Sequence, residues 1–225
     1  MVEYKTLLQE QLNPFMPYLL KAEEIWLVGG AIRDAVLGVQ VKDFDFALKD
    51  NASDFARQFA NEINGTYVLL DAKNDESRVV YKNQIVFDFI HIETIENDLA
   101  RRDFRINAMA MRLPCFELVD PYGGLKDIER KRIKMVSESA LVADPLRILR
   151  GFRFKATLGF KIEVNTLKAL AKYKELLPNV APERIHYELF TLLDSPNSYK
   201  TLRQMTRYGV LQTIIPVIRL MEDVP

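Results

Sequence analysis

Hydrophobic and polar positions along the first 135 or so residues alternate between strand-like and helical periods. An apolar run at Ile25–Val28 leads into two glycines, and residues 43–48 alternate between Phe or Leu and Asp or Ala, which is typical of a β-strand. The segment Ala52–Ile63 has the helical period and ends near Asn-Gly. This mixture predicts an α/β or α+β fold. Further strands are predicted at 67–70, 79–81 and 85–92, and further helices at 31–37 and at 4–22, interrupted near Pro14 and Pro17.

The pattern changes near residue 139, where the strand period disappears and helical periods follow one another. Helices are predicted at 145–158, 164–177, 182–193 and 199–208, with Pro145 and Pro182 near the first turns of two of them. We therefore expect two domains, a mixed domain at 1–137 and an all-helical domain at 138–225.

Composition narrows the class of protein. The chain has 225 residues, 48% hydrophobic and 28% charged, which is typical of a soluble globular protein of one or two domains. Lys and Arg number 31 and so do Asp and Glu, so any site for a polyanion must be a local patch. The first residues do not predict a secretory signal, and no apolar run approaches the roughly 18 residues of a membrane span. A cytoplasmic enzyme that does not bind membranes is expected, while the oligomeric state is not predicted.

Cysteine and histidine are scarce. One cysteine excludes an internal disulfide, and one cysteine with two histidines argues against a zinc site. Because Cys115 lies in Leu-Pro-Cys-Phe, we interpret it as a small core residue rather than a nucleophile.

A glycine pair follows the first apolar strand and precedes a helix. Gly29 and Gly30 allow backbone N–H groups to approach an anion, and a helix N-terminus favours negative charge. Arg33, one turn into the helix, could reach the same anion. A simple tight turn is the alternative interpretation of this pair.

Acidic residues interrupt two apolar strands. Asp43 and Asp45 are two residues apart and therefore share a face, where a divalent cation would relieve their repulsion. Asp88, in Ile-Val-Phe-Asp-Phe-Ile, is a candidate third carboxylate, because two metal ions between carboxylates are a common arrangement for nucleotidyl transfer. His91 is expected on the opposite side and without a role. The alternative is an exposed polar strand face.

The segment 101–110, Arg-Arg-Asp-Phe-Arg-Ile-Asn-Ala-Met-Ala, carries further candidates. Arg102 could neutralise a phosphate, and Asp103 and Asn107 offer groups that suit a ribose hydroxyl. Alternatively, Asp103 caps a helix and the arginine lies on the surface.

One stripe of the helix predicted at 145–158 is basic. Asp144, Arg147, Arg150 and Arg153 step by three residues, and guanidinium groups suit phosphate oxygens and base edges. A solvated basic face is the alternative, and it competes most strongly at Arg153.

Together these segments resemble the class II tRNA nucleotidyltransferase family, which builds or repairs the 3′ CCA end of tRNA and includes bacterial poly(A) polymerases. Val-Gly-Gly-Ala-Ile-Arg-Asp with Asp-Phe-Asp resembles its catalytic motif, and the 101–110 segment resembles its ribose-selecting motif. Asp120-Pro-Tyr-Gly-Gly with Asp127-Ile is similar to its hinge element. Asp144-Pro-Leu-Arg-Ile-Leu-Arg is similar to its nucleobase-template helix, and Ala181-Pro-Glu-Arg-Ile to its neck motif.

The resemblance implies a polymerase-β-type head with a small mixed sheet, followed by a helical neck. It implies that Mg²⁺, as two ions, binds Asp43 and Asp45, and it makes Asp88 the matching third carboxylate. The resemblance also implies that tRNA is the acceptor and CTP or ATP the donor of the nucleotide. The triphosphate is expected to contact Gly29, Gly30 and Arg33, and the sugar and phosphate to contact Arg102, Asp103 and Asn107. Asp144 and Arg147 are expected to read the base, and Arg150 and Arg153 to contact the nucleotide.

Three departures from the family pattern matter. Ala143 stands where the template motif usually has Glu, and the stretch from Asp88 to Arg101 is short, which resembles enzymes that add only CC. Residues 214–225 resemble the passage from neck to body, so we expect a head-plus-neck piece that binds nucleotide and holds tRNA weakly. The alternatives are a poly(A) polymerase and a non-catalytic module that binds RNA or nucleotide.

Overall fold

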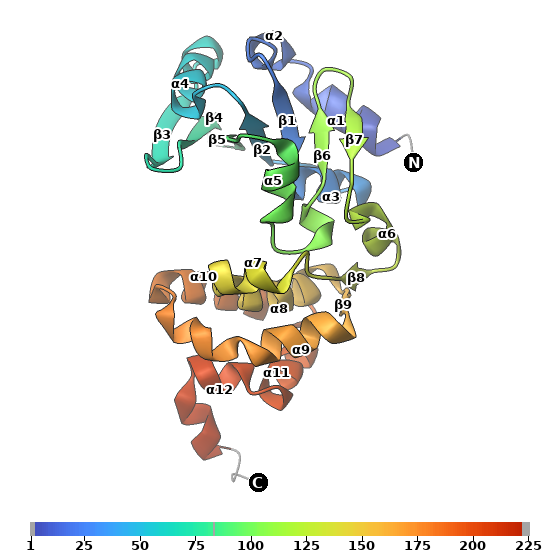
Figure 1. Ribbon diagram of the computed structural model, residues 1–225, viewed down its shortest axis with the longest axis vertical. Helices are drawn as coiled ribbons and strands as arrows, with labels where there is room; N and C mark the ends of the chain where they lie inside the picture. Colours follow the sequence, from blue (N-terminus) through green and yellow to red (C-terminus); the bar gives the residue numbers. More distant parts are fainter. Residues whose placement is uncertain (1–2, 83, 222–225) are drawn as a thin grey trace. The chain divides into compact units, whose positions relative to one another are not determined.

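The computed structural model describes residues 3–82 and 84–221 (Figure 1). It divides into two compact units, Met1–Ile128 and Glu129–Pro225. The boundary expected from the sequence, at 137/138, stays a prediction. The expected passage into a body domain at 214–225 lies partly outside the described residues, at 222–225.

The first unit is built on a seven-stranded sheet with the order β3-β4-β5-β2-β1-β6-β7. Strand β2 pairs in parallel with β5, and the other neighbours are antiparallel, so the sheet is mixed, as predicted. The strands are β1 (Ile25–Val28), β2 (Asp43–Leu48), β3 (Thr66–Asp71), β4 (Glu76–Tyr81), β5 (Ile85–His91), β6 (Ala110–Arg112) and β7 (Glu117–Val119).

Short helices precede, connect and follow these strands. They are α1 (Glu3–Leu12), α2 (Met16–Leu19), α3 (Gly30–Val36), α4 (Ala52–Ile63), α5 (Ile95–Ala100), the 3₁₀-helix η1 (Arg105–Asn107) and α6 (Gly124–Glu129). The interruption predicted near Pro14 separates α1 from α2, because proline cannot donate the helical hydrogen bond. Asn51 accepts from Asp54 N–H at the start of α4, and Asn64 ends it in the left-handed conformation.

One face of the sheet is aromatic and packs against α4. The rings of Phe44 and Phe87 stack with centroids 5.7 Å apart, and those of Phe46 and Phe89 stack at 5.5 Å. Phe59 of α4 meets Phe87 edge-on at 5.1 Å, and Figure 1 shows α4 beside the β3–β5 strands. This packing sends the alternate residues of β2 and β5, the acidic ones, to the opposite face.

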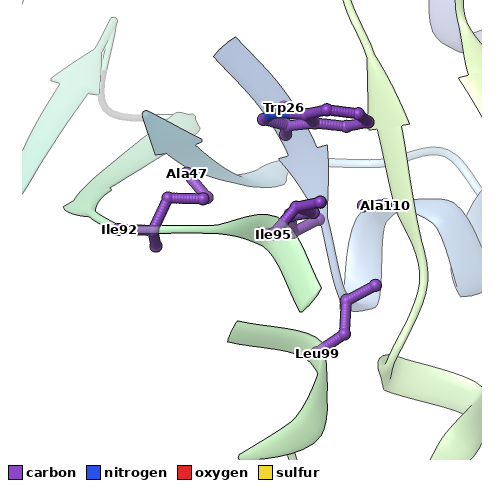
Figure 2. Close-up of a cluster of buried hydrophobic side chains, with 7 residues drawn as sticks. Trp26, Ala47, Ile92, Ile95, Leu99 and Ala110 are labelled. Atoms are coloured by element: carbon purple, nitrogen blue, oxygen red, sulfur yellow. The ribbon is translucent and has the colours of Figure 1, made fainter. Parts of the chain in front are cut away.

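The opposite face carries a smaller apolar cluster that fixes α5. Ile95 and Leu99 of α5 pack with Trp26, Val28 and Ala110 of the sheet (Figure 2). Because Ala47 belongs to the same cluster and lies two residues from Asp45, α5 is held on the face of the sheet that presents the acidic residues.

The second unit consists of helices and one short strand pair. The helices are α7 (Glu138–Ala143), α8 (Leu146–Leu158), α9 (Val164–Lys172), η2 (Lys174–Asn179), α10 (Pro182–Leu193), α11 (Ser198–Arg207), α12 (Val210–Ile214) and η3 (Pro216–Met221). The helices predicted in this half are present, although α9 ends five residues early because the chain tightens into the 3₁₀-helix η2, which contains Pro178. The expectation of no strands is wrong for β9 (Lys161–Ile162), which pairs in parallel with β8 (Arg132–Ile133).

Cys115 is exposed in the turn between β6 and β7, so the prediction of a buried core residue is wrong. The reason is that β6 ends at Arg112 and the hairpin turn carries the cysteine away from the sheet.

Within the described residues, we find no helix with the length and apolar character that a membrane crossing requires.

Candidate active site

Gly29 is the point at which the glycine turn, a carboxylate and an arginine meet. It has φ +74°, and a Cβ placed on it would lie 2.5 Å from Arg102 Nη1 and 3.4 Å from Asp45 Oδ2. Only glycine accepts both the conformation and this close approach. Strand β1 therefore ends in a turn that brings Arg102 and Asp45 together at the N-terminus of α3, although the three residues are far apart in the sequence.

Arg33 lies in a hydrogen-bonded network on the same side of α3. Its Nε and Nη2 donate to the two oxygens of Asp34 at 2.8 and 2.9 Å, and its Nη1 donates to Asn107 Oδ1 at 2.6 Å. Asn107 Nδ2 in turn donates to Asp103 Oδ1 at 3.0 Å. Arg33 also lies beside Gly30, where a Cβ would be 3.3 Å from its Nη2. The structure thus joins Arg33, Asp103 and Asn107 into one unit.

Asp103 immediately precedes Phe104, the N-cap of the 3₁₀-helix η1. Its Oδ1 accepts from Phe104 N–H at 2.7 Å. Asp103 and Asn107 are both buried. Asp103 thus lies next to the N-cap of η1, and it also orients the Asn107 amide and so supports Arg33.

A buried carboxylate that the sequence analysis missed holds Arg102. Asp98 of α5 is 3% exposed, and its Oδ2 accepts from Arg102 Nε at 2.8 Å. Its Oδ1 accepts from Arg101 Nη2 at 2.8 Å. The spacing of three and four residues was a usable signal for these pairs. The surface interpretation of Arg102 is wrong, because its side chain is 19% exposed and lies beside Gly29.

The three candidate carboxylates of the first unit share a face of the sheet. Asp45 pairs in register with Asp88 across β2 and β5, and Asp43 lies two residues before Asp45. Asp43 is exposed and Asp45 is half-buried. These positions agree with the face expected from the sequence.

Asp88 has a partner that the sequence analysis did not identify. Its two oxygens accept from Nε and Nη2 of Arg78, in β4, at 2.8 Å each. Hydrogen bonding to Asp88 raises the pKa of the Arg78 guanidinium against the opposing effect of burial, and the charges of Asp43 and Asp45 add to the increase. Asp88 is therefore neutralised from within the protein.

The residues present fit a magnesium ion bound partly by substrate. Among the described residues, no group of three or more His, Cys, Asp or Glu side chains could hold a metal ion. Mg²⁺ is commonly bound by one or two carboxylates together with phosphate oxygens. Asp45 lies next to the Gly29 turn, and Asp43 is two residues away on the same face of β2. A metal-binding role for Asp88 stays a prediction.

In the second unit, Asp144 lies between α7 and α8 and is held by several groups. Its Oδ2 accepts from Arg184 Nη2 at 3.0 Å and lies 4.0 Å from Arg147 Nε, and its Oδ1 accepts from Leu146 N–H at 3.3 Å. Arg147 Nη1 donates to the carbonyl of Ala140 at 3.1 Å. The structure brings Asp144 and Arg147 together, as expected, and adds Arg184 of α10 to them.

Arg150 and Arg153 converge on a buried acid of α10. Glu188 is 3% exposed, and its Oε2 accepts from Arg153 Nε at 2.5 Å while its Oε1 lies 3.8 Å from Arg150 Nη1. The solvated-face interpretation is wrong for Arg153, whose side chain is 17% exposed and whose guanidinium lies 4.1 Å from the Phe154 ring centre. Glu188 thus supplies an internal counter-charge that the α8 pattern could not reveal.

Comparison with known proteins places these features in a family. Residues 25–134 match the family described as Poly A polymerase head domain, and residues 159–221 match the one described as Probable RNA and SrmB-binding site of polymerase A. The chain is 40% identical over 192 residues to the CC-adding tRNA nucleotidyltransferase of Geobacter sulfurreducens, covering 84% of this chain and 45% of that protein. It is 39% identical over 199 residues to the A-adding tRNA nucleotidyltransferase of Deinococcus radiodurans, covering 86% of this chain and 45% of that protein.

Solved structures agree with the sequence matches. The CCA-adding enzyme of Thermotoga maritima complexed with tRNA has a TM-score of 0.85 at 31% identity, covering 95% of this chain and 55% of that one. The chain spans about half the length of the relatives it matches. With both matched segments in the expected order, the chain belongs to the tRNA nucleotidyltransferase and poly(A) polymerase family.

Proposed function

We propose that this chain transfers C, A or both from CTP or ATP to the 3′ end of tRNA and releases pyrophosphate. The observation that carries the proposal is the position of Gly29 between the Asp45 carboxylate and the Arg102 guanidinium. A carboxylate suited to a metal ion and a cation suited to phosphate, both beside one glycine turn at the start of a helix, fit a metal–triphosphate complex. Relatives named for CC, A and CCA addition support the proposal, and the family is one of metal-dependent nucleotidyltransferases.

The residues around α3 would bind and orient the triphosphate. The N–H groups at the start of α3, freed by Gly29 and Gly30, would donate to phosphate oxygens. Arg33 and Arg102 would neutralise phosphate charge, and their anchors, Asn107 and Asp98, limit the motion of both guanidinium groups. This pre-ordering reduces the entropy that nucleotide binding costs.

We propose that Asp43 and Asp45 hold Mg²⁺, as two ions, with Asp88 as a nearby third carboxylate. The metal would favour deprotonation of the tRNA 3′-hydroxyl and stabilise charge on the departing pyrophosphate. The two aspartates would place the hydroxyl and the α-phosphate in line, which is the main task of the protein in phosphoryl chemistry.

Asp144 and Arg147 would read the base by hydrogen bonds, since an unpaired polar edge strongly disfavours the wrong nucleotide. Arg184 and the Ala140 carbonyl hold this pair in place. Arg150 and Arg153, ordered by Glu188, would complete the nucleotide-binding face of this unit.

Addition of CC alone is the second candidate, and the segment between Asp88 and Arg101 favours it. This segment consists of the end of β5 and the helix α5, whose Ile95 and Leu99 are packed in the apolar cluster of Figure 2. An anchored helix that fixes Arg102 has little freedom to move between additions. The cytoplasmic location expected from the sequence agrees with a tRNA substrate.

To test the proposal, the protein is incubated with Mg²⁺, with CTP or ATP, and with one of three tRNA transcripts that lack CCA, CA or A. Incorporation of C without A identifies CC addition, and C followed by a single A identifies CCA addition. A single A on tRNA ending in CC identifies an A-adding enzyme, whereas a long A tail identifies a poly(A) polymerase. Absence of incorporation by a longer form with the body and tail restored, when the protein still binds CTP or ATP, would leave the non-catalytic module as the correct interpretation.

A further inference from the structure

The connection between α3 and β2, residues 37–42, joins two parts of the candidate site. It follows the helix that begins at the Gly29 turn and carries Arg33, and it leads into the strand that carries Asp43 and Asp45. A displacement of this α3–β2 connection would therefore reach the phosphate-binding turn on one side and the carboxylates on the other. The groups that hold the connection in place thus help to shape the site.

Asp43 depends on this connection more than Asp45 does. Asp45 lies between two strands, because it pairs with Val28 of β1 and with Asp88 of β5. Asp43 pairs with Val86 of β5, and among the described residues the pairing of β2 with β1 goes no further than Asp45. One neighbouring strand fixes Asp43 where two fix Asp45, so the backbone just before Asp43 controls how firmly its carboxylate is placed.

Gln11 of α1 binds the α3–β2 connection at Val41. Its Nε2 donates to the Val41 carbonyl at 3.0 Å, and its Oε1 accepts from Val41 N–H at 3.4 Å. One side-chain amide therefore pairs with both backbone groups of Val41, as a residue of a neighbouring antiparallel strand would. Val41 is 4% exposed, so water is a poor substitute for either bond.

Gln11 is itself held by the packing of α1. Leu8 and Leu12 of the same helix are buried, and α1 lies against α3. Because residues three apart are neighbours on a helix surface, Gln11 lies beside the buried Leu8 and presents its amide from a fixed position. Gln11 lies outside both segments that match the family models, 25–134 and 159–221.

Backbone hydrogen bonds anchor the two ends of the connection. Near α3, Val39 N–H donates to the Asp34 carbonyl at 2.9 Å, and near β2 the Lys42 carbonyl accepts from Val86 N–H at 2.8 Å. Gln11 supplies an anchor between these two bonds. It therefore ties the end of α3 and the start of β2 to a third element of the first unit.

We propose that Gln11 is a positioning residue for the metal ion that accompanies the incoming nucleotide. By fixing the backbone two residues before Asp43, it holds that carboxylate where it can bind metal together with Asp45. The inference rests on the proposed function, because it assigns Gln11 to the metal site proposed there. Groups that orient a metal ligand typically change metal affinity or activity about 10- to 100-fold when they are removed. Since Gln11 acts through the backbone, we expect the lower end of that range.

The test measures CTP binding over a series of Mg²⁺ concentrations, without tRNA, so that no transfer takes place. The variant Gln11→Met keeps the approximate length and volume of the side chain and removes both hydrogen bonds to Val41. Its matched control is Gln9→Met, at an exposed position of the same helix. Thermal melting establishes that both variants fold. If Gln11→Met does not fold, Gln11→Asn, whose amide is one methylene shorter, takes its place.

Gln11→Met should raise the Mg²⁺ concentration that gives half of the full enhancement of CTP binding about tenfold. CTP affinity without Mg²⁺ should stay close to that of the original chain, because Gly29, Arg33 and Arg102 are unaltered. Amide hydrogen exchange at Val41 should become faster, since its N–H loses its acceptor. Gln9→Met should change none of these values. A Mg²⁺ requirement that is unaltered in Gln11→Met would overturn the inference, whatever happens to the melting temperature.

A double variant separates a failure of this inference from a failure of the proposed function. If Gln11 acts through Asp43, adding Gln11→Met to Asp43→Asn should raise the Mg²⁺ requirement no further, whereas independent effects would add. A further increase as large as that in the original chain would show that Gln11 acts on the fold alone, and the inference would be wrong. If Asp43→Asn itself leaves the Mg²⁺ requirement unaltered, the proposed metal site is wrong, and the inference falls with it.

Discussion

Arg102 donates from Nε to Oδ2 of Asp98 at 2.8 Å, and this contact sets the guanidinium beside the Gly29 turn. Asp98 belongs to α5, which is fixed to the sheet through Ile95 and Leu99. The apolar cluster of Figure 2 therefore controls the position of a charged group of the candidate site. Packing and phosphate binding are linked through a single buried carboxylate.

Replacement of Asp98 should damage both stability and nucleotide binding. Asp98→Asn removes the charge that holds two arginines, and we expect a loss of about 2 kcal/mol in the free energy of unfolding, typical of hydrogen bonds to charged groups. Affinity for CTP should also fall, because Arg102 is no longer held beside Gly29. Urea unfolding and CTP titration measure the two effects. Glu96→Gln, at an exposed position of the same helix, is the control and should change neither, and an unaltered CTP affinity in Asp98→Asn would refute the link.

Alanine variants of Gly29 and Gly38 distinguish the effect of backbone strain from the effect of steric overlap with Arg102. Gly29 and Gly38 have φ of +74° and +72°, but a Cβ at Gly29 would overlap Arg102, whereas nothing lies within 4 Å of one at Gly38. Gly38→Ala should lose about 1 kcal/mol of stability from its positive φ. Gly29→Ala should lose more, because its φ of +74° and ψ of −128° lie in a region that is accessible almost only to glycine. Only Gly29→Ala should also lose nucleotide affinity, which a CTP titration beside a thermal melt would detect. Matching CTP affinities in the two variants would mean that the close approach of Arg102 has no role in binding.

Glu76 should make the protein less stable as the pH rises. Burial, followed by the charge of Asp88, raises the pKa of Glu76 above its ordinary value. A carboxyl whose pKa is raised on folding contributes its full stability below the pKa of the unfolded chain and loses it as the pH rises through the folded pKa. Glu76→Gln should therefore be more stable than the original chain at pH 7 and should lose this advantage near pH 4. Unfolding curves at the two pH values measure the difference, and a variant that is less stable at pH 7 would contradict the argument.

The role of Asp88 can be tested through its partner. If Asp88 assists metal binding, Asp88→Asn should raise the Mg²⁺ concentration needed for half-maximal nucleotide addition, and Arg78→Gln should lower it, because it releases both carboxylate oxygens. Magnesium titrations of the reaction rate give both values. If the two variants change stability and leave the Mg²⁺ requirement unaltered, the pair is structural and Asp88 is not a metal-binding residue.

Long helices and alternating strands are predictable from the sequence, because their patterns are local. Helices α4 and α10 have the predicted bounds, and the alternation in 43–48 places Phe44 and Asp45 on opposite faces. Such patterns miss α5, β6 and β7, which are too short for a period to show. Cys115 is misassigned because the hairpin that exposes it joins two of these short strands.

The candidate site shows the same limit. Local motifs identify Gly29, Arg33 and Asp45, yet the groups that hold them depend on pairing between distant elements. Arg78 meets Asp88 only because β4 and β5 are neighbours in this register, and Glu188 meets Arg153 only because α10 packs on α8. A single sequence contains no period or spacing that reveals such contacts.

Nucleotide addition by the Asp45→Asn variant, in parallel with Asp43→Asn, tests the central claim most directly. These variants keep the size of the side chain and remove the charge that would bind metal. Loss of several kcal/mol of transition-state stabilisation should reduce Mg²⁺-dependent addition of C or A to tRNA on the order of 10³-fold. Binding of CTP without Mg²⁺ should stay close to that of the unaltered chain. Addition at the original rate by both variants would contradict the assignment of this site as a metal-dependent nucleotidyltransferase centre.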